Sequence, residues 1–76
     1  MSWLTLREID QRLGAPKGTA FRAFKRLAPA WREGREFRVL DAARDAAEIE
    51  ALRAAGRVYA SSRAIILLSA DAASRI

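Results

Sequence analysis

Cysteine and histidine are both absent from this sequence of 76 residues. Their absence excludes disulfide bonds, thiolate or imidazole metal sites, a cysteine nucleophile, and the usual general base near neutral pH. Large apolar side chains are also scarce, because 17 of the 39 apolar residues are alanine. The chain is therefore expected to form one small domain over residues 1–76, with a thin hydrophobic core.

Segments that would carry the chain into or across a membrane are lacking as well. The longest run of large apolar residues, Ile65–Leu68, is far too short to span a bilayer. The first residues, Met-Ser-Trp-Leu-Thr, do not have the basic and then apolar layout of a signal peptide. We therefore expect a soluble, cytoplasmic protein with no membrane partner.

The sequence also lacks the features of an enzyme. Its Asp and Glu residues are scattered, and most of them have a capping or solvent-facing role that explains them. A core this small leaves little room for a substrate pocket. The glycines Gly14 and Gly18 are not followed by the Gly-Lys-Ser/Thr pattern of a phosphate-binding loop. The sequence therefore predicts a protein that is not an enzyme, with no metal site and no cofactor.

Basic residues are plentiful, and they are concentrated in the first half of the chain. The formal net charge is +5, from 14 Lys and Arg residues against 9 Asp and Glu residues. Residues 1–38 hold nine basic and four acidic residues, whereas residues 39–76 hold five of each. A local basic excess on so small a domain is typical of polyanion binding. The alternative is that these charges serve solubility in a chain rich in arginine and alanine.

Two short helices are predicted within this basic half. Thr5 and Glu8 have the spacing of a capping box, and Gly14 is a typical helix stop, so the first helix is expected over residues 6–13. A proline suits a first helical position, which predicts the second helix over about residues 16–28. In the first helix we expect one apolar stripe and one charged, solvent-facing side. The stripe contains Leu6, Ile9 and Leu13, and the solvent side contains Arg7, Glu8, Asp10, Gln11 and Arg12.

The second predicted helix has one apolar and one basic face. At about 100° per residue, its buried stripe contains Ala20, Ala23, Phe24 and Leu27. The opposite face contains Gly18, Arg22 and Lys25, flanked by Phe21 and Arg26. Two short helices joined by a tight turn, the second basic on its outer face, are typical of a helix-turn-helix. Such a helix enters the major groove, and its first turn is expected to bring unpaired amides and a positive dipole end to the phosphates.

Strands and helices alternate in the prediction for the second half. A strand is expected at Phe37–Leu40, because apolar residues alternate there. A helix follows over about residues 46–55, with Asp45 and Glu48 at capping-box spacing. The fold class is therefore α+β, and we expect a small winged helix-turn-helix-like domain with the order α-α-β-α-β-β-α.

A hairpin and a short helix are expected at the end of the chain. Residues 58–60 and 64–68 are rich in β-branched and aromatic residues and enclose a small polar tip at Ser61–Arg63. Ser69 is a suitable cap for a final helix over residues 70–75.

The helix pair resembles that of a known group of proteins. The run from Leu4 to Arg22 contains Leu-Thr-Leu-Arg-Glu-Ile and then Leu-Gly-Ala-Pro-Lys-Gly-Thr-Ala-Phe-Arg. It is similar to the helix-turn-helix of small phage and mobile-element regulators, among them excisionase-like and MerR-like winged-helix proteins. The shared features are a Leu-Thr pair, an acidic helix, a glycine turn, and a basic-small-Thr start to the recognition helix. The resemblance covers about residues 4–27, and it implies sequence-specific duplex DNA binding with a hairpin wing beside the recognition helix.

The position of the wing departs from that pattern. In MerR-like proteins the hairpin directly follows the helix pair, whereas here a predicted helix over residues 46–55 intervenes. The wing is therefore either the loop around Gly34 or the tip at Ser61–Arg63.

The resemblance and the helix geometry together indicate which residues contact DNA. Arg22 is the strongest candidate for recognising a base edge, because a guanidinium pairs with guanine O6 and N7. Lys25 and Arg26 lie further along the helix, where phosphate contacts are expected. Gly18 either allows close approach to DNA or only eases the turn, and Phe21 either contacts a thymine methyl or belongs to the edge of the core. The candidate DNA-binding residues are Lys17, Gly18, Thr19, Arg22, Lys25, Arg26, Arg32, Arg35 and Arg63, with Arg38 as a weaker backbone contact.

Two functions remain open at this point. The first is a sequence-specific duplex DNA-binding protein, a small transcriptional regulator or recombination-directionality factor, acting as a homodimer or as a cooperative array on repeated sites. The alternative is a module that binds a protein partner, such as an antitoxin, an anti-activator or a phage accessory factor. That alternative uses Ile65–Leu68 as an edge strand, whereas the other interpretation of this run is a core strand buried on both faces. RNA binding ranks lower, because the sequence lacks a run of exposed aromatics.

Overall fold

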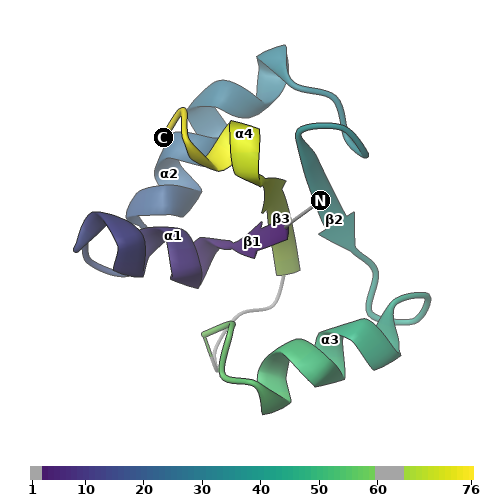
Figure 1. Cartoon of the computed structure of the whole chain (residues 1–76). Helices are drawn as coiled ribbons and strands as arrows, with labels where there is room; N and C mark the ends of the chain where they lie inside the picture. Colours follow the sequence, from purple (N-terminus) through teal and green to yellow (C-terminus); the bar gives the residue numbers. More distant parts are fainter. Residues whose placement is uncertain (1–2, 60–64) are drawn as a thin grey trace.

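Strand β3 (Ile65–Ser69) is the central strand of a three-stranded antiparallel sheet with the order β1-β3-β2 (Figure 1). The computed structural model describes residues 3–59 and 65–76. β1 (Trp3–Thr5) pairs with one edge of β3 and β2 (Phe37–Leu40) with the other. The other elements are α1 (Leu6–Leu13), α2 (Thr19–Leu27), the 3-10 helix η1 (Ala28–Ala30), α3 (Ala46–Ala54) and α4 (Ala70–Ala73). The protein is thus a small α+β domain, and no helix in this described part of the chain is long and apolar enough to cross a bilayer.

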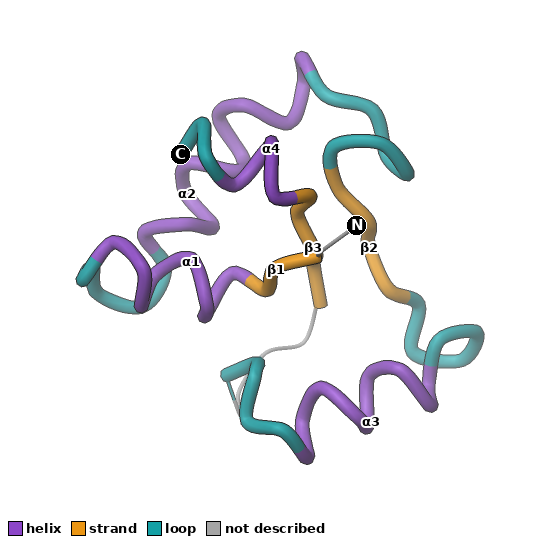
Figure 2. Tube along the Cα trace, in the orientation of Figure 1, coloured by secondary structure: helices purple, strands orange, loops and turns teal. Residues whose placement is uncertain are grey.

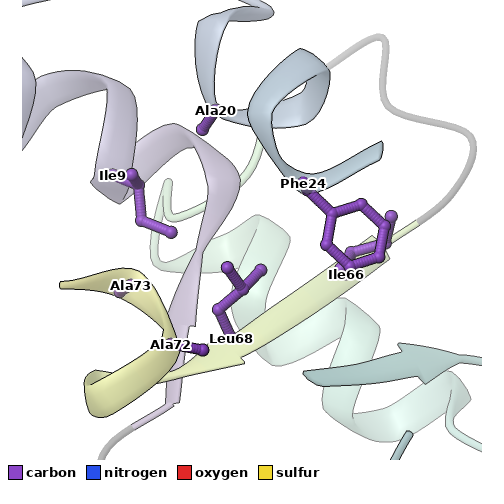
Figure 3. Close-up of a cluster of buried hydrophobic side chains, with 7 residues drawn as sticks. All are labelled: Ile9, Ala20, Phe24, Ile66, Leu68, Ala72 and Ala73. Atoms are coloured by element: carbon purple, nitrogen blue, oxygen red, sulfur yellow. The ribbon is translucent and has the colours of Figure 1, made fainter. Parts of the chain in front are cut away.

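Helices cover both faces of this sheet (Figure 2). Because side chains alternate along a strand, Ile66 and Leu68 face α1, α2 and α4, whereas Ile65 and Leu67 face the side of α3. The first pair packs with a cluster drawn in Figure 3, which contains Ile9, Ala20, Phe24, Ala72 and Ala73. The second pair packs with Leu40, Leu52 and Val58. Every residue of β3 is buried, so the core-strand interpretation of Ile65–Leu68 is confirmed and the edge-strand alternative is wrong.

Helix α1 forms where the local signals predict it. The Thr5 side chain accepts a hydrogen bond from the N–H of Glu8 at 3.1 Å, and the Glu8 carboxylate accepts one from the N–H of Thr5 at 2.9 Å. Gly14 ends the helix in the left-handed conformation, with a φ of 63°. The prediction of residues 6–13 is confirmed. Leu13 is an exception to the predicted stripe, because 47% of it is exposed and the core contacts of α1 end at Ile9.

Helix α2 begins at Thr19, three residues later than predicted. Pro16 and Lys17 instead belong to a turn, in which the N–H of Thr19 donates to the carbonyl of Pro16 at 3.2 Å. Gly18 is the N-cap of the helix and has a φ of 95°, a conformation that favours glycine. The left-handed backbone at Gly18 is not helical, so the helix can start only after it.

The two helices of the second half start where predicted, but α4 ends at Ala73, two residues before its predicted end. Only one of the two predicted N-caps forms. Ser69 caps α4 by accepting a hydrogen bond from the N–H of Ala72 at 3.1 Å. The capping box predicted for α3 is wrong, because the Asp45 side chain makes no bond within the first turn of that helix. Its carboxylate accepts a hydrogen bond from the N–H of Asp41 at 2.8 Å instead. The turn that precedes α3 therefore uses the carboxylate that was expected to cap the helix.

The predicted hairpin does not provide the partner of β3. Val58 and Tyr59 are not in a strand, and both edges of β3 are occupied by β1 and β2. Apart from η1, the element order is β-α-α-β-α-β-α, not the predicted α-α-β-α-β-β-α. Val58 packs into the apolar cluster on the α3 side of the sheet without being part of a strand. The predicted tip, Ser61–Arg63, lies outside the described residues.

Polar contacts hold Arg57 against α1 and β1. Its guanidinium donates to the Glu8 carboxylate at 3.2 and 3.0 Å and to the carbonyl of Trp3 at 3.0 Å. The Thr5 hydroxyl donates to the carbonyl of Arg57. Burial alone raises the pKa of Glu8, but the hydrogen bonds from Arg57 and from the N–H of Thr5 outweigh it and hold the pKa below its ordinary value of 4.5.

Replacing Glu8 by glutamine tests this pair. Glu8→Gln is expected to lower the free energy of unfolding by about 1 kcal/mol at pH 7, because glutamine keeps the cap but loses the charge. The effect is modest because the Glu8 and Arg57 side chains are 29% and 39% exposed. A carboxyl group with a lowered folded-state pKa stabilises the fold above its unfolded pKa, and this stabilisation disappears as the pH falls through the folded value.

Urea unfolding at a series of pH values measures the effect. Wild-type stability should fall below about pH 5, and the fall should be smaller in Glu8→Gln. Glu50 is exposed on α3, so Glu50→Gln removes a carboxylate from the surface and is the matched control. Identical pH profiles for the wild type and Glu8→Gln would contradict a stabilising role for the Glu8–Arg57 pair.

Candidate nucleic-acid interface

The outward face of α2 is basic and exposed to solvent. Arg22, Lys25 and Arg26 are all exposed, whereas Ala20, Ala23 and Phe24 are buried on the opposite side of the same helix. Their spacing of three and four residues places the three basic side chains next to one another on the helix surface. The two faces of α2 are therefore where the periodicity of the sequence predicts them.

The charges on this face are not neutralised by carboxylates of the described residues. The ion pairs found within residues 3–59 and 65–76 involve other arginines, and none includes Arg22, Lys25 or Arg26. Lys25 has its Nζ atom 5.6 Å from the centre of the Phe21 ring, a distance typical of a cation–π contact. Phe21 itself is 41% exposed, so it belongs to the same outward face and not to the core.

A buried carboxylate occupies the N-terminus of α2. Asp10 is only 1% exposed, and its carboxylate accepts hydrogen bonds from the N–H of Ala20 at 2.7 Å and from the N–H of Gly18 at 3.2 Å. The hydroxyl of Tyr59 donates a third bond to it at 2.6 Å. Asp10 was predicted on the solvent side of the first helix, and that prediction is wrong. It caps α2 from outside, because Gly18 has no side chain that could do so.

The cap by Asp10 reduces the number of backbone N–H groups at the start of α2 that are available to bind a phosphate. The N–H groups of Gly18, Thr19 and Ala20 already donate to Asp10 or to the carbonyl of Pro16, so three of the amides that were expected to be unpaired have acceptors within the protein. The negative charge of Asp10 also offsets the positive end of the helix dipole. The side chains of Lys17 and Thr19 are therefore better candidates for a phosphate contact at this end of α2 than the backbone of residues 18–20.

Tyr59 links the start of α2 to α1. Lys17 Nζ lies 5.1 Å from the centre of its ring, and the guanidinium carbon of Arg7 lies 5.8 Å from it. The hydrogen bond to Asp10 raises the pKa of Tyr59, and burial and the negative charge of Asp10 raise it further. The phenol therefore remains a hydrogen-bond donor at neutral pH. Sequence analysis did not identify Tyr59 or Asp10 as part of this region.

The loop around Gly34 is a tight turn and not a hairpin wing. The N–H of Gly34 donates to the carbonyl of Phe37 at 2.6 Å, and the N–H of Arg32 donates to the Glu36 carboxylate at 2.7 Å. Arg32 and Arg35 are both exposed on this turn, which follows α2 and η1 (Figure 1). Arg35 lies 3.9 Å from the Glu36 carboxylate, so its charge is partly compensated. The first of the two expected wing positions is therefore wrong.

Two other arginines that were DNA-contact candidates, Arg38 and Arg63, do not belong to α2. Arg38 donates two hydrogen bonds to the Glu48 carboxylate of α3, at 3.3 and 3.2 Å, and its guanidinium lies 5.8 Å from the centre of the Trp3 ring. These contacts make Arg38 a link between the sheet and α3, and its charge is partly compensated by Glu48. Arg63 lies outside the described residues, so its predicted role is not addressed by the structure.

Comparison of the chain with models of protein families, with curated proteins and with solved structures finds no match in any of the three. The resemblance of residues 4–27 to phage and mobile-element regulators therefore has no support beyond the residues that carry it. Function has to be inferred from the geometry and the charge of α2.

Proposed function

We propose that this protein binds duplex DNA in a sequence-specific manner, with α2 in the major groove, as a small transcriptional regulator or recombination-directionality factor. The observation that supports it is the outward face of α2, where Arg22, Lys25 and Arg26 are exposed without carboxylate partners among the described residues. The major groove admits one α-helix, and arginine and lysine supply both phosphate and base contacts there.

The helix pair is well suited to present α2 rigidly. α1 and α2 are joined by a short turn, and the Asp10 carboxylate of α1 binds the backbone of α2 at Gly18 and Ala20. On its inner side, Phe24 packs with the rings of Phe37 and Trp31, whose centres lie 5.1 and 6.4 Å away. A helix held at its start and along its buried face loses little conformational entropy when it docks, which favours specific recognition.

In this proposal the residues of α2 have different roles. Arg22 recognises a base edge, and guanine is its preferred partner. Lys25 and Arg26 bind phosphates, which position the helix without recognising sequence. Phe21 is exposed beside Lys25, where it can contact a thymine methyl.

Alanine variants on the two faces of the molecule test these roles. Arg22→Ala is expected to lower the affinity for a selected duplex by about 5- to 150-fold, which corresponds to about 1–3 kcal/mol, and to remove the preference at one base pair. Lys25→Ala is expected to weaken binding to all sequences alike. Both are measured by fluorescence anisotropy, with duplexes selected from a random pool at physiological salt.

Arg53 provides the matched control for these variants. It is exposed on α3, which covers the other face of the sheet, so Arg53→Ala removes the same charge away from α2. We expect its affinity to stay within about twofold of the wild type. If Arg22→Ala kept both the affinity and the base preference of the wild type, α2 would not be the recognition helix.

The alternative function is a module that binds a protein partner. The surface that was expected to bind this partner is not exposed. That surface was the run Ile65–Leu68, which is the buried central strand of the sheet.

The selected duplexes also address the oligomeric state. Inverted half-sites about 10 base pairs apart would indicate a homodimer, whereas direct repeats would indicate a cooperative array.

A further inference from the structure

A largely apolar cavity lies between α1, the start of α2, residues 58–59 and the first residues of β3. Its volume is about 330 Å³, within the range of roughly 300–1,000 Å³ in which small molecules bind proteins. One water molecule occupies about 30 Å³ in the liquid, so this volume corresponds to about ten groups of that size. The apolar part of its lining consists of Leu6, Phe21, Val58, Ile65 and Ile66.

Two basic side chains, those of Arg7 and Lys17, form part of the polar side of this cavity. Arg7 and Lys17 both line it, and both lie against the ring of Tyr59, at 5.8 and 5.1 Å from its centre. Arg7 donates its hydrogen bond to the neutral carbonyl of Gly56, at 2.5 Å, so that bond does not neutralise its charge.

Among the described residues of the lining, Asp10 is the carboxylate, and its oxygens already have partners within the protein. They accept hydrogen bonds from the backbone N–H groups of Gly18 and Ala20 and from the hydroxyl of Tyr59. The described lining therefore combines an apolar interior with a polar side that contains two cations and one carboxylate, a formal charge of +1. That combination is complementary to a molecule with one apolar and one anionic end.

We propose that this cavity binds a small amphiphilic anion, namely an aliphatic or aromatic chain of about ten non-hydrogen atoms that ends in a carboxylate. The chain packs against Leu6, Phe21 and Ile66, and the carboxylate lies beside Arg7 and Lys17. This site does not depend on DNA binding by α2, although Lys17 and Phe21 belong to both surfaces. The structure thus assigns the cavity a ligand class that is distinct from nucleic acid.

Octanoate, an eight-carbon carboxylate, is the probe for this site. Titrated into the isotope-labelled protein, it should produce saturable NMR shifts at the methyl groups of Leu6, Val58 and Ile66. For a ligand of this size the dissociation constant should be on the order of 0.1–1 mM. Octylamine has the same chain and the opposite charge, so it should bind at least about tenfold more weakly.

Two variants locate the site. Arg7→Gln should weaken octanoate binding about fivefold, because it removes one cation from the polar side. Arg12→Gln removes the same charge from an exposed position of α1 that does not line the cavity, and should leave the affinity within about twofold. Val58→Phe fills the cavity and should abolish the shifts at Leu6 and Ile66, provided that its amide spectrum shows a folded protein. If Val58→Phe does not fold, the comparison of Arg7→Gln with Arg12→Gln shows whether octanoate binds in this cavity.

Three results would overturn the proposal. The first is the absence of saturable shifts at octanoate concentrations up to about 5 mM. The second is equally tight binding of octylamine, which would show that charge complementarity plays no part. The third is a set of shifts confined to Leu40 and Ile49, which line a second groove on the α3 side of the sheet. Duplex affinity is measured separately, so failure here leaves the proposed DNA binding untouched.

Discussion

Raising the monovalent salt concentration from 50 to 200 mM is expected to weaken duplex DNA binding by about 250- to 4,000-fold. The reason is that each phosphate neutralised by the protein releases condensed counterions, so the logarithm of the affinity falls linearly with the logarithm of the salt concentration. Five or six phosphate contacts correspond to a slope of about −4 to −6. In the proposed complex these contacts come from exposed cations other than Arg22, namely Lys17, Lys25, Arg26, Arg32 and Arg35.

Anisotropy titrations of a labelled duplex at five or more salt concentrations yield this slope. Lys25→Gln should make the slope shallower by about one unit, whereas Arg53→Gln on α3 should leave it unchanged. A wild-type slope shallower than about −2 would mean that few phosphates are contacted. In that case the basic face of α2 would serve solubility or a protein partner, and the DNA proposal would be wrong.

Asp10→Ala is expected to lower the free energy of unfolding by about 3 kcal/mol. The substitution leaves the N–H groups of Gly18 and Ala20 and the hydroxyl of Tyr59 without their acceptor in a part-buried region. It also removes a negative charge from the N-terminus of α2, where the helix dipole favours one. In a domain of this size the melting temperature should fall by about 10–20 °C.

Thermal and urea unfolding compare this variant with two others. Tyr59→Phe removes only one of the three hydrogen bonds and should lower the free energy of unfolding by about 1 kcal/mol. Asp71→Ala removes a carboxylate of α4 whose side chain is 76% exposed, and should change stability by less than about 0.5 kcal/mol. If Asp10→Ala were as mild as Asp71→Ala, the capping of α2 by Asp10 would not stabilise the fold.

Much of the helical structure could be predicted because its signals lie close together in the chain. The capping box of Thr5 and Glu8 located the start of α1, and Ser69 located the start of α4. The periodicity of α2 also separated its buried residues from Arg22 and Lys25. Such features depend on hydrogen bonds and burial among residues three or four positions apart, and the order of the residues specifies them directly.

The functional region was predicted only in part. Local periodicity placed Asp10 among the solvent-facing residues of α1, because the apolar stripe was assigned to Leu6, Ile9 and Leu13 and Asp10 is charged. Its partners on α2 are eight and ten residues away, and Tyr59 is 49 residues away. One signal could have suggested them, namely a helix that starts at a glycine without a side-chain cap of its own. An acceptor from elsewhere in the chain was needed for that helix to start there.

The sequence by itself determined the positions of the helices, the basic excess of the first half and the two faces of α2. The tertiary structure alone decided that β1 exists, that β3 lies at the centre of the sheet, and that Asp10 is buried. Trp3 and Ser69, which are paired across the sheet, come from opposite ends of the chain. The physical reason is that strand pairing and the burial of a charge depend on which distant segments meet, and on the loop entropy lost in bringing them together. Neither the pairing of distant strands nor the burial of a charge can be predicted from a pattern of neighbouring residues.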